Sequence, residues 1–129
     1  MKDSVLKFGK PVLKNLEYKV SDEHMENKKV NLHRCFHSNI IRVTNENESI
    51  VELTIQIGCD EKSVNPPFSL ELTIGARFHW NEDLEEDFVA GLLEVSAPAL
   101  LVGYARPIIA NITSNSIGQY DLPFVDFTK

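Results

Sequence analysis

Two histidines and a cysteine alternate in the first third of the chain, at His33, Cys35 and His37. Alternate residues of a strand project from the same side, so these side chains and a further ligand such as His79 would offer donors to zinc. Strand neighbours at i and i+2 lie about 7 Å apart, whereas closed zinc sites gather their ligands from turns at short fixed spacings. We therefore expect two polar histidines flanking a half-buried cysteine, and no bound metal.

The other chemically reactive residues of the sequence do not form a catalytic motif either. Cys59 has no base beside it and falls in an apolar strand phase, which raises the pKa of a thiol and keeps it inert. The acidic run from Glu82 to Asp87 is typical of a solvated helix start. No Gly-rich phosphate loop, Ser-His-Asp set or dinucleotide fingerprint is present. We expect a protein that is not an enzyme and needs no cofactor.

Composition limits the partners and the compartment. The 129 residues are 43% hydrophobic and 25% charged, which predicts one globular domain spanning residues 1–129. A net charge of −6 with scattered lysines disfavours nucleic acid and anionic membranes. The longest apolar run, Ala97 to Tyr104, is shorter than the roughly 20 residues that cross a bilayer, so no membrane insertion is expected. The N-terminus lacks an apolar signal region and two cysteines make no disulfide framework, so we expect a cytoplasmic protein.

Alternating hydrophobicity predicts an antiparallel hairpin. Even positions are apolar from Phe68 to Trp80, and odd positions are apolar from Val51 to Cys59. This period of two is typical of half-buried strands, and the link between them ends in Pro66-Pro67. The two strands should therefore pair.

Two further strands are predicted upstream. Residues 33–44 change their alternation between Phe36 and Ile41, as a bulge would produce. Residues 6–20 would place their even-numbered apolar side chains, Val12 among them, on one face, with a bend or edge position at Gly9 to Pro11.

After Trp80 the hydrophobic period becomes helical. Asn81 would cap a short helix, and Ser96 would restart a second, main helix with Pro98 in its first turn. On the main helix, one apolar stripe is predicted to hold Ala97, Leu101, Tyr104, Ala105, Ile108 and Ile112. Pro107 lies inside this helix and Gly118 would end it.

These elements predict an α+β domain in which a four-stranded antiparallel sheet carries one short and one main helix on one face. Four strands of about 10 residues make an apolar face roughly 19 Å by 33 Å, whereas one helix covers a strip about 10 Å wide. The uncovered remainder predicts an oligomer, a hydrophobic binding surface, or both.

The C-terminal third resembles the SecB family of protein-export chaperones. That family has a Pro-Asn-hydrophobic start, a Tyr-Ala-Arg in mid-helix and a Leu-x-x-Pro-Val-Asn-Phe segment, and the pieces here are Pro98, Tyr104-Ala105-Arg106 and Leu122-Pro123-Phe124-Val125-Asp126-Phe127. Residues 14–20 also look like that family's first strand. Family members continue into a long C-terminal helix, whereas the sequence here ends at Lys129, so the resemblance is to a short variant with a groove open on that side.

The resemblance implies an ATP-independent holdase, assembled as a dimer or tetramer, that binds unfolded or partly folded polypeptides in apolar grooves. The groove candidates that it points to are Phe78, Trp80, Phe88, Leu92, Leu93, Tyr120, Phe124 and Phe127. It also implies docking of the export ATPase SecA on an acidic sheet surface, of which only Glu71 keeps its charge, because the strand-one acids fall at Asn15 and Lys19. The alternatives are a non-chaperone module of the same fold, binding one specific protein or a small apolar ligand, and a metal-dependent or thiol enzyme.

Overall fold

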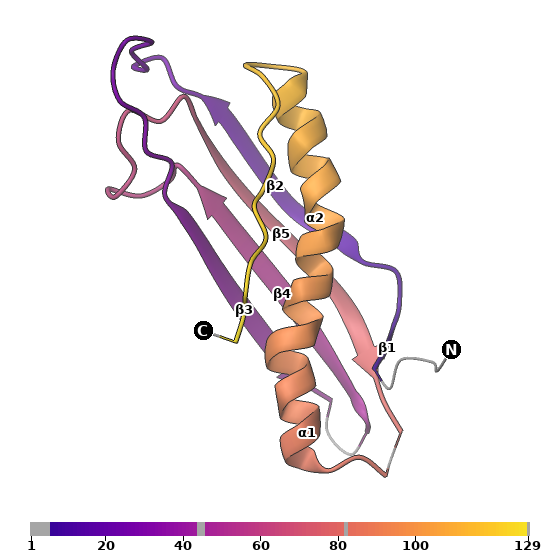
Figure 1. The fold of residues 1–129 in the computed structure, drawn as a ribbon. Coiled ribbons are helices and arrows are strands. Elements are labelled where there is room, and N and C mark those ends of the chain that lie inside the picture. Colours follow the sequence, from indigo (N-terminus) through magenta and orange to yellow (C-terminus); the bar gives the residue numbers. More distant parts are fainter. Residues whose placement is uncertain (1–5, 44–45, 82, 129) are drawn as a thin grey trace.

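The computed structural model describes residues 6–43, 46–81 and 83–128, which form one antiparallel sheet with a long helix across one face (Figure 1). The strands are β1 (Lys7–Phe8), β2 (Val12–Val20), β3 (Arg34–Arg42), β4 (Glu48–Ile57) and β5 (Phe68–His79). The helical elements are α1 (Glu86–Gly91), the π-helical turn η1 (Leu92–Ser96) and α2 (Ala97–Ser114).

Strand β5 is the centre of the sheet. It pairs with β4 on one side and with both β1 and β2 on the other, while β3 lies outside β4. Alternate residues of β4 and β5 are buried, because their side chains face the helix. The predicted hairpin and the α+β architecture are confirmed.

The predicted first strand is divided in two. Gly9 to Pro11 separate β1 from β2, and both pieces run along β5 as one edge of the sheet. A bulge lies between Leu13 and Asn15 in β2. The bulge changes the face: Leu13 pairs with the buried Ile74, whereas Val12 pairs with Gly75 and projects outward, so the predicted phase was wrong at Val12.

The bulge predicted between Phe36 and Ile41 is also wrong. Strand β3 pairs with β4 in unbroken register from Arg34 to Arg42. The alternation changes because the inward position carries the polar Ser38 while Ile41 projects outward, with no irregularity of the backbone.

The two predicted helices form one continuous helix. It begins at Glu86 with Glu85 as N-cap, not at Asn81, and runs through Ser96 without interruption. The wide turn of η1 directly precedes Pro98, whose ring would otherwise press on the carbonyl four residues back. Pro107 lies inside α2 as predicted.

By length and composition alone, this 29-residue helix (Glu86–Ser114) is long and apolar enough to cross a membrane, a property that the core helix of a globular domain can share. A buried stripe that includes Ala97, Leu101 and Ala105 packs the helix onto the sheet. Only 39% of its most apolar stretch is buried within the chain. The rest of this apolar surface is available to a partner.

An ion pair fixes the start of the helix to the edge of the sheet. Arg42 of β3 donates two hydrogen bonds to the Glu86 carboxylate, at 2.8 and 3.1 Å, and its guanidinium lies 5.2 Å from the Trp80 ring centroid. The hydrogen bonds from Arg42 lower the pKa of Glu86 below its ordinary value.

The lowered pKa predicts a pH-dependent contribution to stability. A carboxyl whose folded pKa is depressed stabilises the fold above its unfolded pKa, and this stabilisation disappears as pH falls through the folded pKa. We expect Arg42→Met to lower the melting temperature at pH 7 more than at pH 3, as measured by circular dichroism. Equal decreases at both pH values would contradict this assignment.

Candidate functional site

Residues 119–128, here called the strap, follow α2 and run back alongside it over the sheet (Figure 1). The strap belongs to no strand; four of its apolar side chains pack on the core, whereas Pro123 and Phe124 stay exposed. The inward side chains are Tyr120, Leu122, Val125 and Phe127.

Side chains of the sheet and helix hold the strap at both ends. The Tyr120 amide donates to Thr113 Oγ1 at 2.8 Å, and Arg34 of β3 donates to the Tyr120 hydroxyl at 3.0 Å. At the other end, the Phe127 ring meets that of Phe36 edge-on, with centroids 6.1 Å apart. The strap therefore bridges α2 and β3.

Two clefts flank the strap. One, of about 650 Å³, lies beside the end of β2 and is lined by Val20, His24, Leu32, Pro67, Ile117 and Tyr120. The other, of about 430 Å³, lies at the start of β3; its apolar lining is Leu32, Phe36, Pro123, Phe124 and Val125, and its polar lining is Asn31, His33, Arg34 and Asp126. Leu32 borders both clefts.

Phe124 stands at the second cleft and is 86% exposed, the most exposed of the large apolar side chains in the described part of the chain. Arg106 of α2 places its guanidinium 5.8 Å from this ring and donates to the Pro123 carbonyl at 3.0 Å. An exposed aromatic ring beside a cleft with both apolar and polar lining is a contact surface for another apolar side chain.

The structure separates the predicted groove residues into three sets. Tyr120, Phe124 and Phe127 come together on the strap. Phe88 is 50% exposed and Leu92 is half-buried, both on the N-terminal part of the helix. The remaining three, Phe78, Trp80 and Leu93, fill the core. They are therefore not part of the candidate binding site.

A second apolar surface lies between α2 and the β1–β2 edge. Leu100, Tyr104 and Ile108, spaced four apart on α2, are only partly covered, and Tyr104 is 45% exposed. The Tyr104 ring meets that of Phe8 edge-on at 6.3 Å. We call this the Tyr104 surface and define it as Phe8, Leu13, Leu16, Leu100, Tyr104 and Ile108.

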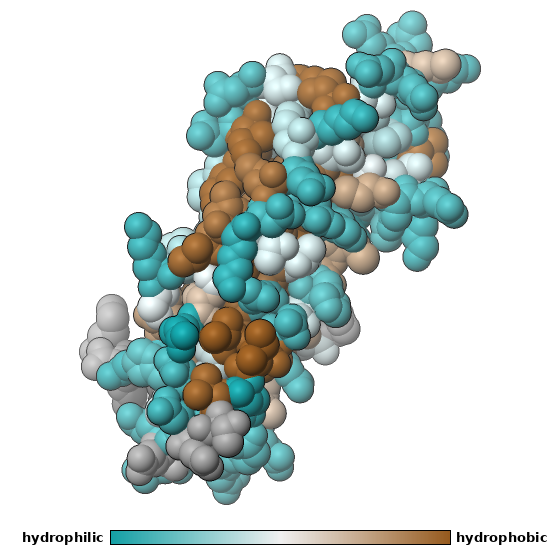
Figure 2. Space-filling model, turned by 180° about the vertical axis from the view of Figure 1, so that it is seen from behind, coloured by the Kyte–Doolittle hydropathy of each residue, from teal (hydrophilic) through white to brown (hydrophobic). Residues whose placement is uncertain are grey.

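Sequence reasoning missed the Tyr104 surface. The predicted stripe was right for Ala97, Leu101 and Ala105, which the structure buries together with Ile109. It also included Tyr104 and Ile108, which the structure leaves only partly covered. The signal that would have found it is the four-residue spacing from Leu100 to Ile108. In the view from behind, hydrophobic side chains form a strip in the upper half of the molecule that reaches its left edge, and a second group lies lower on an otherwise mostly hydrophilic face (Figure 2).

The outer face of the sheet carries Glu71 and the predicted histidine row. The Glu71 carboxylate accepts hydrogen bonds from Gln56, at 2.6 Å, and from Asn15, at 3.4 Å. His37 lies on this face by its pairing with Thr54, whereas the His33 ring lies 2.6 Å from the Asp60 carboxylate. Within residues 6–43, 46–81 and 83–128, no three His, Cys, Asp or Glu side chains are grouped to hold a metal ion.

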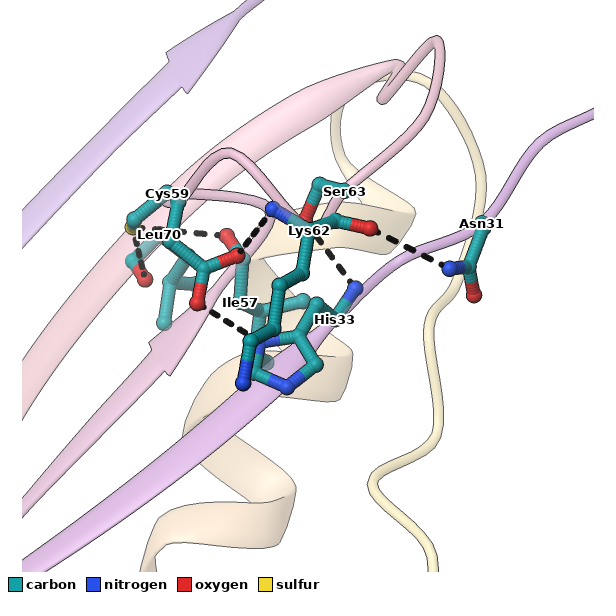
Figure 3. A network of polar contacts seen from close by, with 8 residues as sticks. Asn31, His33, Ile57, Cys59, Lys62, Ser63 and Leu70 are labelled. Atoms are coloured by element: carbon teal, nitrogen blue, oxygen red, sulfur yellow. Dashed lines mark hydrogen bonds and ion pairs between the residues drawn. The ribbon is translucent and has the colours of Figure 1, made fainter.

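Cys59 lies in a polar network between the ends of β3, β4 and β5 (Figure 3). Its thiol donates to the carbonyls of Leu70, at 3.2 Å, and Ile57, at 3.5 Å, while Ser63 accepts from the His33 amide at 3.0 Å. Cys59 follows the end of β4 and is exposed, so its predicted place in an apolar strand phase was wrong. Partial burial of the thiol still raises its pKa, and the hydrogen bonds oppose this shift only in part.

The raised pKa predicts slow alkylation, because the thiolate is the nucleophile. We expect Cys59 in the folded protein to react with iodoacetamide more slowly at pH 8 than it does in denaturant, as followed by peptide mass spectrometry in a Cys35→Ser background. A folded rate equal to the unfolded rate would contradict this.

No protein-family model matches this sequence, and no curated protein matches it. The structure is similar to that of the Mycobacterium tuberculosis SecB-like chaperone Rv1957 in complex with a ChAD peptide from the HigA1 antitoxin, with a TM-score of 0.73 and 10% identity over 93% of this chain and 90% of that chain. A Streptococcus agalactiae protein of unknown function matches with a TM-score of 0.48 and 14% identity, over 92% of this chain and 97% of that chain. The chain therefore has the SecB-like fold, as the sequence resemblance predicted.

Proposed function

We propose that this protein is an ATP-independent, chaperone-like protein of the cytoplasm that binds non-native polypeptides at the strap and its two clefts. The observation that carries the proposal is Phe124, a phenylalanine 86% exposed beside a cleft of about 430 Å³. Unfolded chains expose apolar side chains that such a surface removes from water, without any need for a nucleotide.

The comparison supports the same class of ligand. The SecB-like chaperone with this fold was solved with a peptide bound. We transfer from it only the kind of partner, a polypeptide segment, and assign the binding residues from this chain: Tyr120, Phe124 and the cleft side chains Leu32 and Phe36.

The Tyr104 surface has a different role in the proposal. It is apolar, lies on the opposite side of α2 from β3, and combines a helix stripe with a sheet edge, which suits the self-complementary contact of a homo-oligomer. Assembly through this surface would leave the strap and its clefts free for clients.

A link to protein export does not enter the proposal. Its candidate docking residue, Glu71, is engaged by the amides of Gln56 and Asn15, so a partner would have to displace these hydrogen bonds. SecA docking is therefore left out of the proposal.

The proposal predicts that Phe124→Asp weakens the binding of an unfolded client. Full burial of a phenylalanine contributes about 1.5–3 kcal/mol, which corresponds to roughly tenfold to hundredfold in affinity. The measurement is suppression of aggregation of several unrelated unfolded proteins without nucleotide, together with the dissociation constant for one of them.

Val12→Asp is the matched control, because Val12 is a 56% exposed apolar residue on the outer face and receives the same charge. Equal client affinity in the two variants would remove the strap from the binding site. Capture of one folded partner, with no binding of any unfolded protein, would favour the specific interaction module instead.

A further inference from the structure

The two edges of the sheet differ in how well they are protected. The β1–β2 edge contains Pro11, a bulge after Leu13 and the lysines Lys14 and Lys19, all of which hinder the addition of another strand. Strand β3 has none of these features: its nine residues keep unbroken register with β4 and include no proline and no lysine. An unprotected edge of this length is a template for strand pairing.

Hydrogen bonds at both ends of β3 fix which of its backbone groups are free. Gly58 donates to the His33 carbonyl at 3.0 Å, and Val43 donates to the Glu48 carbonyl at 3.1 Å. The odd-numbered positions therefore pair with β4, and the even-numbered positions direct N–H and C=O to the open side. Within the described residues, the backbone groups of positions 34, 36, 38, 40 and 42 bond to no other backbone on that side.

A second copy of the same strand is a poor occupant. Antiparallel two-fold pairing centred on Ser38 would set Arg34 directly opposite Arg42 at both ends, and like charges in that position are destabilising. Strand β3 carries two arginines and no carboxylate. Its charge therefore fits an extended segment with an acidic residue opposite Arg34.

The neighbouring cleft gives such a segment a continuous path. Arg34 and Phe36, whose free backbone groups begin the open edge, also line the cleft of about 430 Å³ beside Phe124. Side chains at the even positions face the helix side of the sheet, where the Ser38 hydroxyl is buried with no partner in the described part of the chain. A segment leaving the cleft thus meets unpaired backbone groups directly.

We propose that clients bind by strand addition: an extended segment leaves the cleft at Phe124 and pairs with β3, with a carboxylate set against Arg34. This rests on the proposed function, because it names the binding mode of the same polypeptide ligand. Main-chain hydrogen bonds supply affinity independent of sequence, and alternate side chains enter the apolar surface beside Phe36.

The test uses the full chain and a fluorescein-labelled peptide of nine residues, Ser-Asp-Val-Thr-Leu-Thr-Val-Ser-Glu, with fluorescence anisotropy as the readout. Two further versions carry N-methyl groups at three odd or at three even central positions. In a paired strand, the N–H groups of alternate residues point toward β3, so only one of the two methylated sets blocks hydrogen bonds to it. We expect that version to bind at least about tenfold more weakly and the other to bind as the parent does.

On the protein side, Ser38→Pro removes an N–H that faces the open edge and leaves the bonds to β4 in place. We expect it to weaken the parent peptide about tenfold, while Ser38→Ala, which removes only the hydroxyl, does not. Should Ser38→Pro fail to fold by circular dichroism, the methylated peptides decide the question on the unmodified protein.

Equal binding of both methylated peptides, no binding of the parent peptide, or pairing of β3 with a second copy in cross-linking would each overturn strand addition. These outcomes are distinct from failure of the proposed function, in which unfolded proteins themselves do not bind. If unfolded proteins bind and both methylated peptides also bind equally, the protein is a chaperone that holds its clients by side-chain contacts alone.

Discussion

Phe78→Ala is expected to lower the free energy of unfolding by about 3–5 kcal/mol, the usual cost of removing a fully buried phenylalanine. The Phe78 side chain is fully buried on β5, with the Phe8 ring centroid 6.0 Å from its own. Truncation would leave a cavity between the centre of the sheet and its β1 edge. Denaturant unfolding followed by circular dichroism measures the change.

Phe124→Ala is the matched control for this prediction. The same side chain is lost from an 86% exposed position whose only described ring contact is with Arg106, so the cost should stay below about 1 kcal/mol. If the free energy of unfolding fell little for Phe78→Ala and much for Phe124→Ala, the placement of Phe78 in the core and Phe124 on the surface would be contradicted.

If the protein assembles through the Tyr104 surface as proposed, Tyr104→Asp is expected to break that contact and give a smaller species at micromolar concentration. In a symmetric contact the charge would enter the interface at least twice, and an unpaired carboxylate is costly to bury. Size-exclusion chromatography with light scattering gives the mass of each species.

Val12→Asp again serves as the control, since it adds the same charge to the outer face of the neighbouring strand. A wild-type protein that is monomeric at micromolar concentration would contradict assembly altogether. An oligomer that withstands Tyr104→Asp would place the interface elsewhere.

The central hairpin could be predicted from the sequence because burial and alternation agree there. Every inward position of β4 is occupied by an apolar residue except Ser49, and the outward positions are mostly polar. At the edges this agreement fails. Ser38 faces inward and Val12 outward, since a half-covered strand tolerates either kind of residue on either side.

The helix shows the same limit. From the sequence, one helix was predicted to end and another to begin at Ser96. The chain instead forms a π-helical turn there, before Pro98, and continues as a helix. Local sequence signals do not distinguish a break from a π-helical turn. Tyr104 was predicted to share one stripe with the residues of this helix that are buried, but it is exposed in the structure. Which apolar residues face inward depends on how α2 crosses the sheet, and local sequence does not determine that crossing.

For the candidate site, the sequence predicted that apolar and aromatic residues would form it, but not which of them lie at the surface. Phe78 and Phe124 are the same residue type, yet the first lies in the core and the second on the strap. Their difference arises from the strap crossing back between α2 and β3, a tertiary contact fixed by Arg106 and Tyr120. No periodicity in the sequence encodes that contact.

The most direct test of the central claim is to titrate this protein, without nucleotide, with one model protein in two states: permanently unfolded by reduction and alkylation, and native. Isothermal titration calorimetry gives the affinity for each. The account predicts binding of the unfolded state with a negative heat-capacity change, as burial of apolar surface requires, and no binding of the native state. Failure to bind the unfolded state, or equal binding of both states, would contradict it.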